Sequence, residues 1–299
     1  MQSSVDCNSR WVYLDPFRGT IAAVAESARN VSCVGAEPVA ITNNLNFSSP
    51  ETEIGYWQLS SSCNGISEAC KALETPVTGG NVSLYNESKN KDNEITPINP
   101  TPVIGMVGRI HNVENAISSG WKNINDQIWL IGSNKSERTI AASSYLEYFH
   151  GEITGRPPKI DLLDEKFCQS FLRKAILENF VVSSHDVSDG GLAIALAECC
   201  ILSSKGATIE LQKDLNRVDN LLFAEGGSRI IFSLDKKKEK EWSNYLEQIQ
   251  RNSQSSVYVQ KIGYVSSDRL KIKIKDKNIC NIRVEELTEK FNNSISSHL

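Results

Sequence analysis

The chain contains 299 residues, of which 40% are hydrophobic and 23% charged, a composition that excludes general disorder and leaves room for one large domain or two medium ones. Its formal net charge of −4 at pH 7 gives no reason to expect a nucleic acid or a membrane surface as the main partner. No segment approaches the roughly 18 consecutive apolar residues of a membrane helix. The polar start MQSSVDCNSR lacks the apolar core of a signal peptide. We therefore expect a soluble, cytoplasmic protein.

Helices and strands are predicted to alternate in the first part of the chain. One helix is predicted from apolar residues at steps of three and four, which form a single buried face: Ile21, Val24, Ala28 and Val31. Gly35 follows as the expected end of this helix. A second helix stripe with similar spacing consists of Leu59, Cys63, Ile66, Cys70 and Leu73. Strands are predicted at Val39–Thr42, Pro76–Thr78 and 101–110, with a polar, proline-punctuated excursion at 88–100.

The alternation continues in the second part of the chain. Strands are predicted at 127–132, 180–183, 229–234 and 271–275. Helices are predicted around Phe167–Ile176 and after the polar turn HDVSDGG. This pattern indicates an α/β or α+β architecture, and we predict two domains, residues 1–112 and 113–299.

The cysteines do not suggest disulfides or zinc. The eight positions contain no paired C-x-x-C framework. Free cysteine behaves as a small hydrophobic residue, so we interpret them as reduced and mostly buried.

The segment TPVTGGNVSLYNES, residues 75–88, is the first candidate site. Gly79 and Gly80 can adopt backbone angles that other residues avoid, so that peptide N–H groups face a phosphate. Asn81 and Ser83 then supply neutral oxygens. The segment is neither a P-loop nor a G-x-G-x-x-G fingerprint. An ordinary glycine turn is the alternative.

Acidic and amide side chains form a second candidate site. Glu26 and Asn30 lie four residues apart on one helix face, and Asp186 and Ser188 precede a helix start. A solvated helix surface and a helix cap are the simpler explanations. Oxygen ligands that converge from several segments are, however, what magnesium with a polyphosphate requires. His185 is a candidate general base, although a structural histidine is the favoured interpretation.

Several segments together resemble a known family. They are residues 5–51, 75–88, 100–108 (PTPVIGMVG) and 183–198 (SSHDVSDGGLAIALAE). In this order they are similar to the second half of the synthetase subunit of phosphoribosylformylglycinamidine synthase. The similarity covers about residues 5 to 235.

The resemblance implies an ATP-dependent carbon–nitrogen ligase of purine biosynthesis. Such an enzyme converts formylglycinamide ribonucleotide, with ATP and ammonia from glutamine, to the amidine. The implied cofactors are ATP and Mg²⁺, and the implied partners are a glutaminase subunit and a small bridging subunit. The implied fold is an aminoimidazole ribonucleotide synthetase-like unit: an N-terminal α/β half that pairs sheets into a barrel, then an α+β half.

The resemblance also assigns residues. Gly80 would contact ATP, Asn81 would bind magnesium, and Ser83 would contact the substrate. Asn43 stands where the family usually has an aspartate near ATP, so it keeps an oxygen but loses a charge. An auxiliary nucleotide site would have the metal ligands Asp6, Glu26, Asn30 and Asp186, with Ser188 near the nucleotide.

The family's catalytic histidine, an ATP-binding lysine and most substrate contacts belong to an N-terminal half that these 299 residues lack. We therefore expect no catalytic residue in this chain and no first strand before VDCNSRW. We also expect no activity without a separate N-terminal half. A non-catalytic nucleotide-binding scaffold is the alternative. Another superfamily enzyme, such as a selenophosphate synthetase or thiamine phosphate kinase, ranks last because those enzymes lack TNNLNF followed by GGNVSLYNE.

Overall fold

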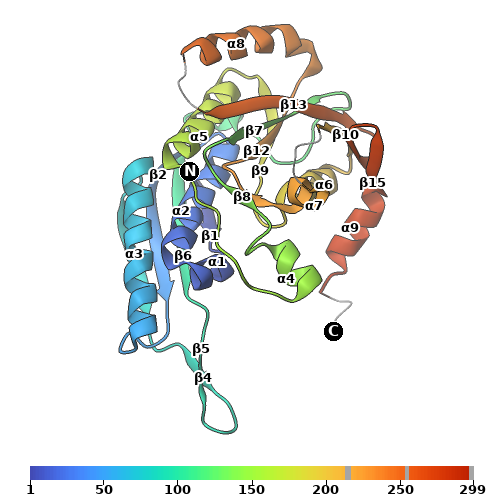
Figure 1. Ribbon diagram of the computed structural model, residues 1–299. Coiled ribbons are helices and arrows are strands. Elements are labelled where there is room, and N and C mark those ends of the chain that lie inside the picture. The colour runs from blue at the N-terminus through green and yellow to red at the C-terminus, as the bar shows by residue number, and fades with distance from the viewer. Residues whose placement is uncertain (213–216, 253–255, 296–299) are drawn as a thin grey trace.

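The computed structural model describes residues 1–212, 217–252 and 256–295, and its helices and strands gather around two sheets (Figure 1). One sheet has four strands and the other seven, and two short two-stranded pairs accompany them. This mixed helix and strand architecture confirms the predicted fold class. Among the described residues, no helix is both long enough and apolar enough to cross a membrane.

The four-stranded sheet belongs to the first part of the chain. In order across the sheet its strands are β1 (Gln2–Asp6), β6 (Thr101–Arg109), β2 (Glu37–Asn46) and β3 (Val77–Ser83). β2 and β3 are parallel, whereas β6 runs antiparallel to both β1 and β2. The expectation of no strand ahead of VDCNSRW is wrong, because β1 begins at Gln2 and pairs along its whole length with β6.

Among the described residues, helices cover one face of this sheet. They are α1 (Ser9–Leu14), α2 (Pro16–Cys33) and α3 (Glu53–Leu73). Along β6, the residues facing the helices are buried, and the alternate residues, such as Val103 and Val107, are partly exposed. On β1, Val5 is 71% exposed. The second face of the sheet is therefore open.

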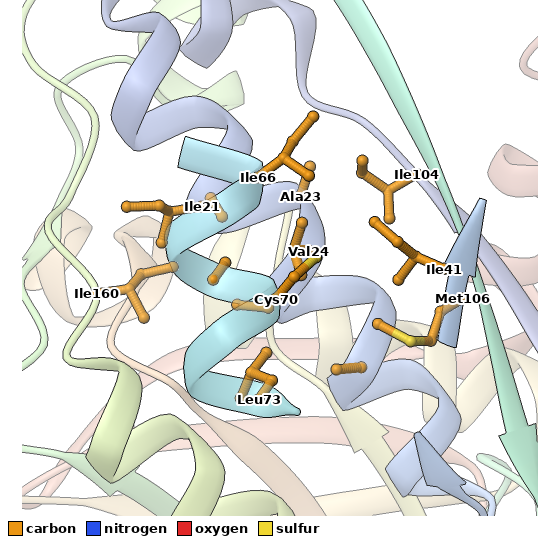
Figure 2. Close-up of a cluster of buried hydrophobic side chains, with 14 of the residues drawn as sticks. Ile21, Ala23, Val24, Ile41, Ile66, Cys70, Leu73, Ile104, Met106 and Ile160 are labelled. Carbon is orange, nitrogen blue, oxygen red and sulfur yellow. The ribbon is translucent and has the colours of Figure 1, made fainter. Parts of the chain in front are cut away.

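The core of this region lies between α2, α3 and the sheet (Figure 2). The predicted stripe of α2 is confirmed, since Ile21, Val24, Ala28 and Val31 are all buried. The helix starts at Pro16 because Asp15 caps it, accepting a hydrogen bond from the Arg18 backbone N–H at 3.0 Å. The stripe predicted for α3 is wrong at one position, Cys63, which is exposed.

The seven-stranded sheet forms the second part of the chain. In order across the sheet its strands are β15 (Lys277–Arg283), β14 (Arg269–Ile274), β10 (Gly206–Leu211), β13 (Val257–Ser266), β7 (Gln127–Ser133), β12 (Ile230–Leu234) and β9 (Val181–Asp186). The accompanying helices are η1 (Val113–Asn115), α4 (Ser144–His150), α5 (Leu162–Leu177), α6 (Gly191–Ser203), α7 (Val218–Phe223), η2 (Lys236–Lys238), α8 (Glu239–Asn252) and α9 (Val284–Asn292). The short pairs are β4 (Glu87–Lys89) with β5 (Ile95–Pro97), and β8 (Arg138–Thr139) with β11 (Glu225–Gly226). The β4–β5 hairpin projects away from the body of the protein (Figure 1) and accounts for the predicted polar excursion.

Helix α2 joins the two parts by packing against α5 and β9. The Arg29 guanidinium pairs with the Glu165 carboxylate at 2.8 Å, and both side chains are buried. Gln169 Nε2 donates to the Ala25 carbonyl at 3.3 Å. Buried polar contacts of α2 thus help to hold the two parts of the chain together.

All eight cysteines are free. The buried ones are Cys33, Cys70, Cys168, Cys199 and Cys200. The interpretation that most are buried is therefore confirmed.

Candidate functional site

The glycine-containing segment is a strand rather than the predicted loop. Its residues from Val77 to Ser83 form β3, which pairs in parallel with β2 at the edge of the four-stranded sheet. The register places Gly80 opposite Asn43, and Asn81 opposite Asn44. Parallel neighbours begin and end at the same edge of a sheet, so the polar ends of both strands lie together.

Gly80 is required by a close contact. A Cβ at this position would lie 2.0 Å from the Asn43 side-chain oxygen. At Gly79 a Cβ would meet nothing within 4 Å. Both glycines have the ordinary negative φ of a strand, so the prediction of unusual backbone angles is wrong.

Alternation along the strand divides the predicted residues between two faces. Asn43 and Gly80 lie on the face toward the helices, because their neighbours Ile41 and Leu45 on β2 are buried there. Asn81 and Ser83 lie on the open face. Sequence reasoning brought all four to one site but gave no indication of this division.

Hydrogen bonds fix the polar side chains at the end of β3. Asn81 Nδ2 donates to Asn44 Oδ1 at 3.1 Å, which orients the Asn81 carboxamide. Ser83 Oγ donates to Asn86 Oδ1 at 3.2 Å, and Asn86 Nδ2 donates to the carbonyls of Ser83 (2.8 Å) and Phe47 (3.1 Å). Asn44 and Asn86 are the residues that the sequence analysis did not single out.

The surface beside Asn43 is hollowed. A cavity of about 500 Å³ lies between α3 and the start of β3, a volume within the usual range for small-molecule sites. Its lining combines apolar groups such as Ile66 with Lys71 and Glu74 at the end of α3. The candidate residues therefore lie at an accessible surface and not in a sealed apolar interior.

These residues supply oxygens rather than charges. Asn81 is exposed and its carboxamide oxygen makes no hydrogen bond within the described residues. Magnesium prefers oxygen ligands and keeps several waters, so one amide oxygen here fits a Mg²⁺ ion carried by a polyphosphate. Asn81 would hold such an ion, which would neutralise phosphate charge.

The second candidate site lies where β1, α2 and β9 meet. Asp6 accepts hydrogen bonds from Ser27 Oγ at 2.6 Å and from Asn30 Nδ2 at 2.9 Å. Glu26 and Asp186 lie close enough to interact: burial and the Asp186 charge raise the pKa of Glu26 well above its ordinary value. The structure therefore brings together the four predicted ligands.

The fit of these residues to a metal is partial. Within the described ranges Asp186 Oδ2 is buried without a hydrogen-bond partner, which suits a cation. The oxygens of Asp6 are already engaged, and the described part of the chain contains no group of three or more His, Cys, Asp or Glu side chains arranged to hold a metal. The cavity that Glu26 and Ser188 line is only about 10 Å³, room for about one water. A nucleotide would require it to open.

His185 has a structural environment. Its Nδ1 lies 2.7 Å from the Asp186 carbonyl oxygen, and its Nε2 lies 3.5 Å from a Glu198 carboxylate oxygen. Burial alone would lower the pKa of His185, but the hydrogen bond and charge of Asp186 raise it to about 9. An imidazole that stays protonated at neutral pH is not an available general base.

Comparisons with known proteins identify the family of this chain. Models of the AIR synthase related protein family match residues 1–110 with the N-terminal domain and residues 123–275 with the C-terminal domain. The phosphoribosylformylglycinamidine synthase subunit PurL of Prochlorococcus marinus (strain MIT 9312) is 88% identical over 296 residues, which are 99% of this chain and 38% of that relative. The chain thus spans about two fifths of the length of the curated relatives it matches.

Solved structures share the fold at low sequence identity. Thermotoga maritima PurL superimposes with a TM-score of 0.76 when complexed with FGAR and 0.70 when complexed with ATP, at 16% identity, over 96% of this chain and 45% and 43% of those chains. The thiamine-monophosphate kinase of Stenotrophomonas maltophilia K279a gives 0.62 at 15% identity, over 91% of this chain and 85% of the kinase. The chain belongs to the AIR synthase-related family and corresponds, over nearly its whole length, to part of a PurL subunit.

Proposed function

We propose that this chain forms part of a PurL-type synthetase that converts formylglycinamide ribonucleotide to its amidine at the expense of ATP. The main observation behind the proposal is that polar residues gather at the ends of β2 and β3. There Asn43 lies opposite Gly80, and the Asn81 and Ser83 side chains share the open face. The 88% identity to a PurL subunit supports the same activity. A glutaminase subunit would supply ammonia, and a small bridging subunit would complete the assembly.

The residues would act by binding and positioning. The backbone of Gly80 would contact the nucleotide, the Asn81 oxygen would hold Mg²⁺, and Ser83 Oγ would bind the substrate. Bound Mg²⁺ would supply charge neutralisation for the phosphoryl group. Binding the nucleotide and the substrate side by side at the end of β3 would make the reaction between them effectively intramolecular. None of these groups is a strong acid or base, so they would not transfer the protons of the reaction.

The open face of the four-stranded sheet supports the further proposal that the chain does not act alone. Val5 and Asn44 on this face are exposed, and the family expectation is a barrel formed by two such sheets. A second synthetase unit on this face would cover β1 and β6 and bring its own catalytic groups toward Asn81 and Ser83. We propose that activity requires this unit.

The test is reconstitution. The chain is co-expressed with the remaining part of a PurL subunit, and amidine formation is measured with formylglycinamide ribonucleotide, ATP, Mg²⁺ and ammonium, so that no glutaminase is needed. Asn81→Ala should lower kcat/KM by about tenfold or more, the effect of losing one charge-assisted contact. It should also raise the Mg²⁺ concentration required for half-maximal activity.

Two variants serve as controls. Asn44→Ala removes the same Asn44–Asn81 hydrogen bond but leaves the Asn81 oxygen. It therefore distinguishes the loss of the magnesium ligand from the loss of side-chain orientation. Asn278→Ala changes an exposed strand asparagine on β15 and should have no effect. A soluble assembly without activity, in which the chain still binds Mg·ADP by calorimetry, would contradict the proposal and favour the scaffold role.

A further inference from the structure

A further cavity lies at the opposite end of β2 from the candidate site, where the two parts of the chain meet. Its volume is about 240 Å³, small for a drug-sized ligand and sufficient for a compact metabolite. The start of β2, residues 110–115 and the last turns of α5 surround it. Its polar lining includes Glu37, His111, Asn112, Asn115, Arg173 and Lys174.

Arg173 makes no direct ion pair within the described residues, although Glu37 is near enough to act on its charge. One of its guanidinium N–H groups donates to Ser32 Oγ at 2.7 Å. Burial lowers its pKa, and Glu37 is the single acidic group that offsets this effect. The hydrogen bond to Ser32, in the last turn of α2, uses one of the five N–H donors of the guanidinium. The other donors face the cavity or solvent and are available to a ligand.

The neighbouring side chains are also unengaged. Lys174 and Asn115 make no side-chain hydrogen bond or ion pair within the part of the chain that the structure describes. Asn112 uses its side-chain oxygen to accept from the Glu114 backbone N–H at 3.1 Å, which leaves its amide N–H groups as donors. The lining is therefore rich in donors.

Glu37 does not neutralise this surplus. Its carboxylate is held by Arg109 Nη2 at 2.8 Å and lies 3.3 Å from His111 Nε2. The pKa of Glu37 is lowered, chiefly by the hydrogen bond from Arg109. Glu37 therefore pairs directly with Arg109 and acts on Arg173 only at longer range. One carboxylate faces the two cations Arg173 and Lys174, so the lining keeps a net positive charge.

We propose that this cavity binds a small anion carrying a phosphate group. A tetrahedral phosphate has enough acceptor oxygens for the guanidinium, the ammonium and the amide donors at once. The lining comes from β2, the connecting segment and α5, so a bound anion would tie the two parts of the chain together and stabilise their junction. This site is separate from Asn81 and Ser83 and does not depend on the proposed synthetase activity.

Calorimetric titration of the whole chain with inorganic phosphate tests the proposal, with sodium chloride at matched ionic strength as the reference. Removal of a charged donor should weaken binding about tenfold or more, so Arg173→Gln and Lys174→Gln should both lose affinity. Glu37→Gln removes a like charge and should tighten binding several-fold. Lys174 is exposed, so its variant decides the matter if Arg173→Gln fails to fold.

Two controls locate the phosphate. Arg156→Gln removes an exposed arginine that pairs with Asp15 and does not line the cavity, and it should bind as the unchanged chain does. Asn81→Ala should likewise have no effect. Affinity that falls with Asn81→Ala and persists in Arg173→Gln and Lys174→Gln would overturn the proposal, as would no binding beyond that of chloride.

Discussion

Replacing Arg29 by methionine tests whether burial determines how much an ion pair contributes to the stability of this protein. The Arg29–Glu165 pair has a 2.8 Å contact, and its side chains are only 6% and 0% exposed. Removing one partner of a buried pair costs about 3–5 kcal/mol because the other charge stays buried. Gln169 Nε2 still donates to Glu165 at 2.9 Å, so we expect the lower part of this range, about 3 kcal/mol.

The Arg109–Glu37 pair is the matched comparison. It has the same 2.8 Å contact, but its side chains are 61% and 45% exposed. Arg109→Met should therefore cost at most about 1 kcal/mol. Urea unfolding followed by circular dichroism measures both free energies of unfolding. The double variant Arg29→Met/Glu165→Met should recover part of the loss, because the Glu165 carboxylate no longer stays buried without its partner. Equal costs for the two single variants would refute the reasoning.

Three further predictions concern other parts of the chain. Gly80→Ala should lower the free energy of unfolding by about 1–3 kcal/mol, because the new Cβ would lie 2.0 Å from Asn43 Oδ1; an unchanged urea midpoint would contradict this. Burial raises the pKa of Glu225 above its ordinary 4.5, so the folded state binds its proton more tightly and this group costs stability as pH rises above 4.5. Glu225→Gln should thus gain stability relative to the unchanged chain between pH 4.5 and 7, and a difference independent of pH would disprove it. N-ethylmaleimide should label the native chain first at Cys63, the exposed thiol, and Cys63→Ser should abolish that first phase in mass spectrometry; an undiminished phase would show that another thiol reacts.

The helices were predictable where local periodicity was sufficient. The stripe of α2 is buried at every predicted position because this helix packs against the sheet, α3 and α5. On α3 the same periodicity was wrong at Cys63. Spacing identifies one face of a helix, but how far a neighbouring element extends over that face is a tertiary property. Figure 2 shows the neighbouring Ile66 and Cys70 directed toward α2.

The strand β3 was not predictable from local sequence. Glycine and asparagine are depleted in strands, so T-G-G-N favours a loop. Pairing with β2, which lies far away in the sequence, supplies the backbone hydrogen bonds that hold Gly79–Ser83 extended. The importance of Asn44 was missed for the same reason, since its contact with Asn81 exists only in this register.

The two faces of β3 lead to a different explanation for each glycine. Gly80 must be glycine for a reason internal to the fold, because Asn43 occupies the space of a side chain. Gly79 has no such reason, since a Cβ there would meet nothing within 4 Å. Gly79 pairs with Thr42 on the open face, the face that also carries Asn81. The missing side chain at Gly79 therefore leaves free the surface on which a nucleotide would lie beside Asn81.

Gly79→Ala separates folding from binding on this basis. Its free energy of unfolding should stay within about 0.5 kcal/mol of the unchanged value. In the reconstituted synthetase, KM for ATP should rise several-fold, because the methyl group would occupy space next to the ligand. Val82→Ala is the matched change on the helix-facing side of the same strand, where Val82 pairs with Leu45, and it should leave KM unaltered. If Gly79→Ala bound ATP normally, the nucleotide would have to approach β3 from the side of Asn43 and the 500 Å³ cavity, and the role of Asn81 as its magnesium ligand would be lost.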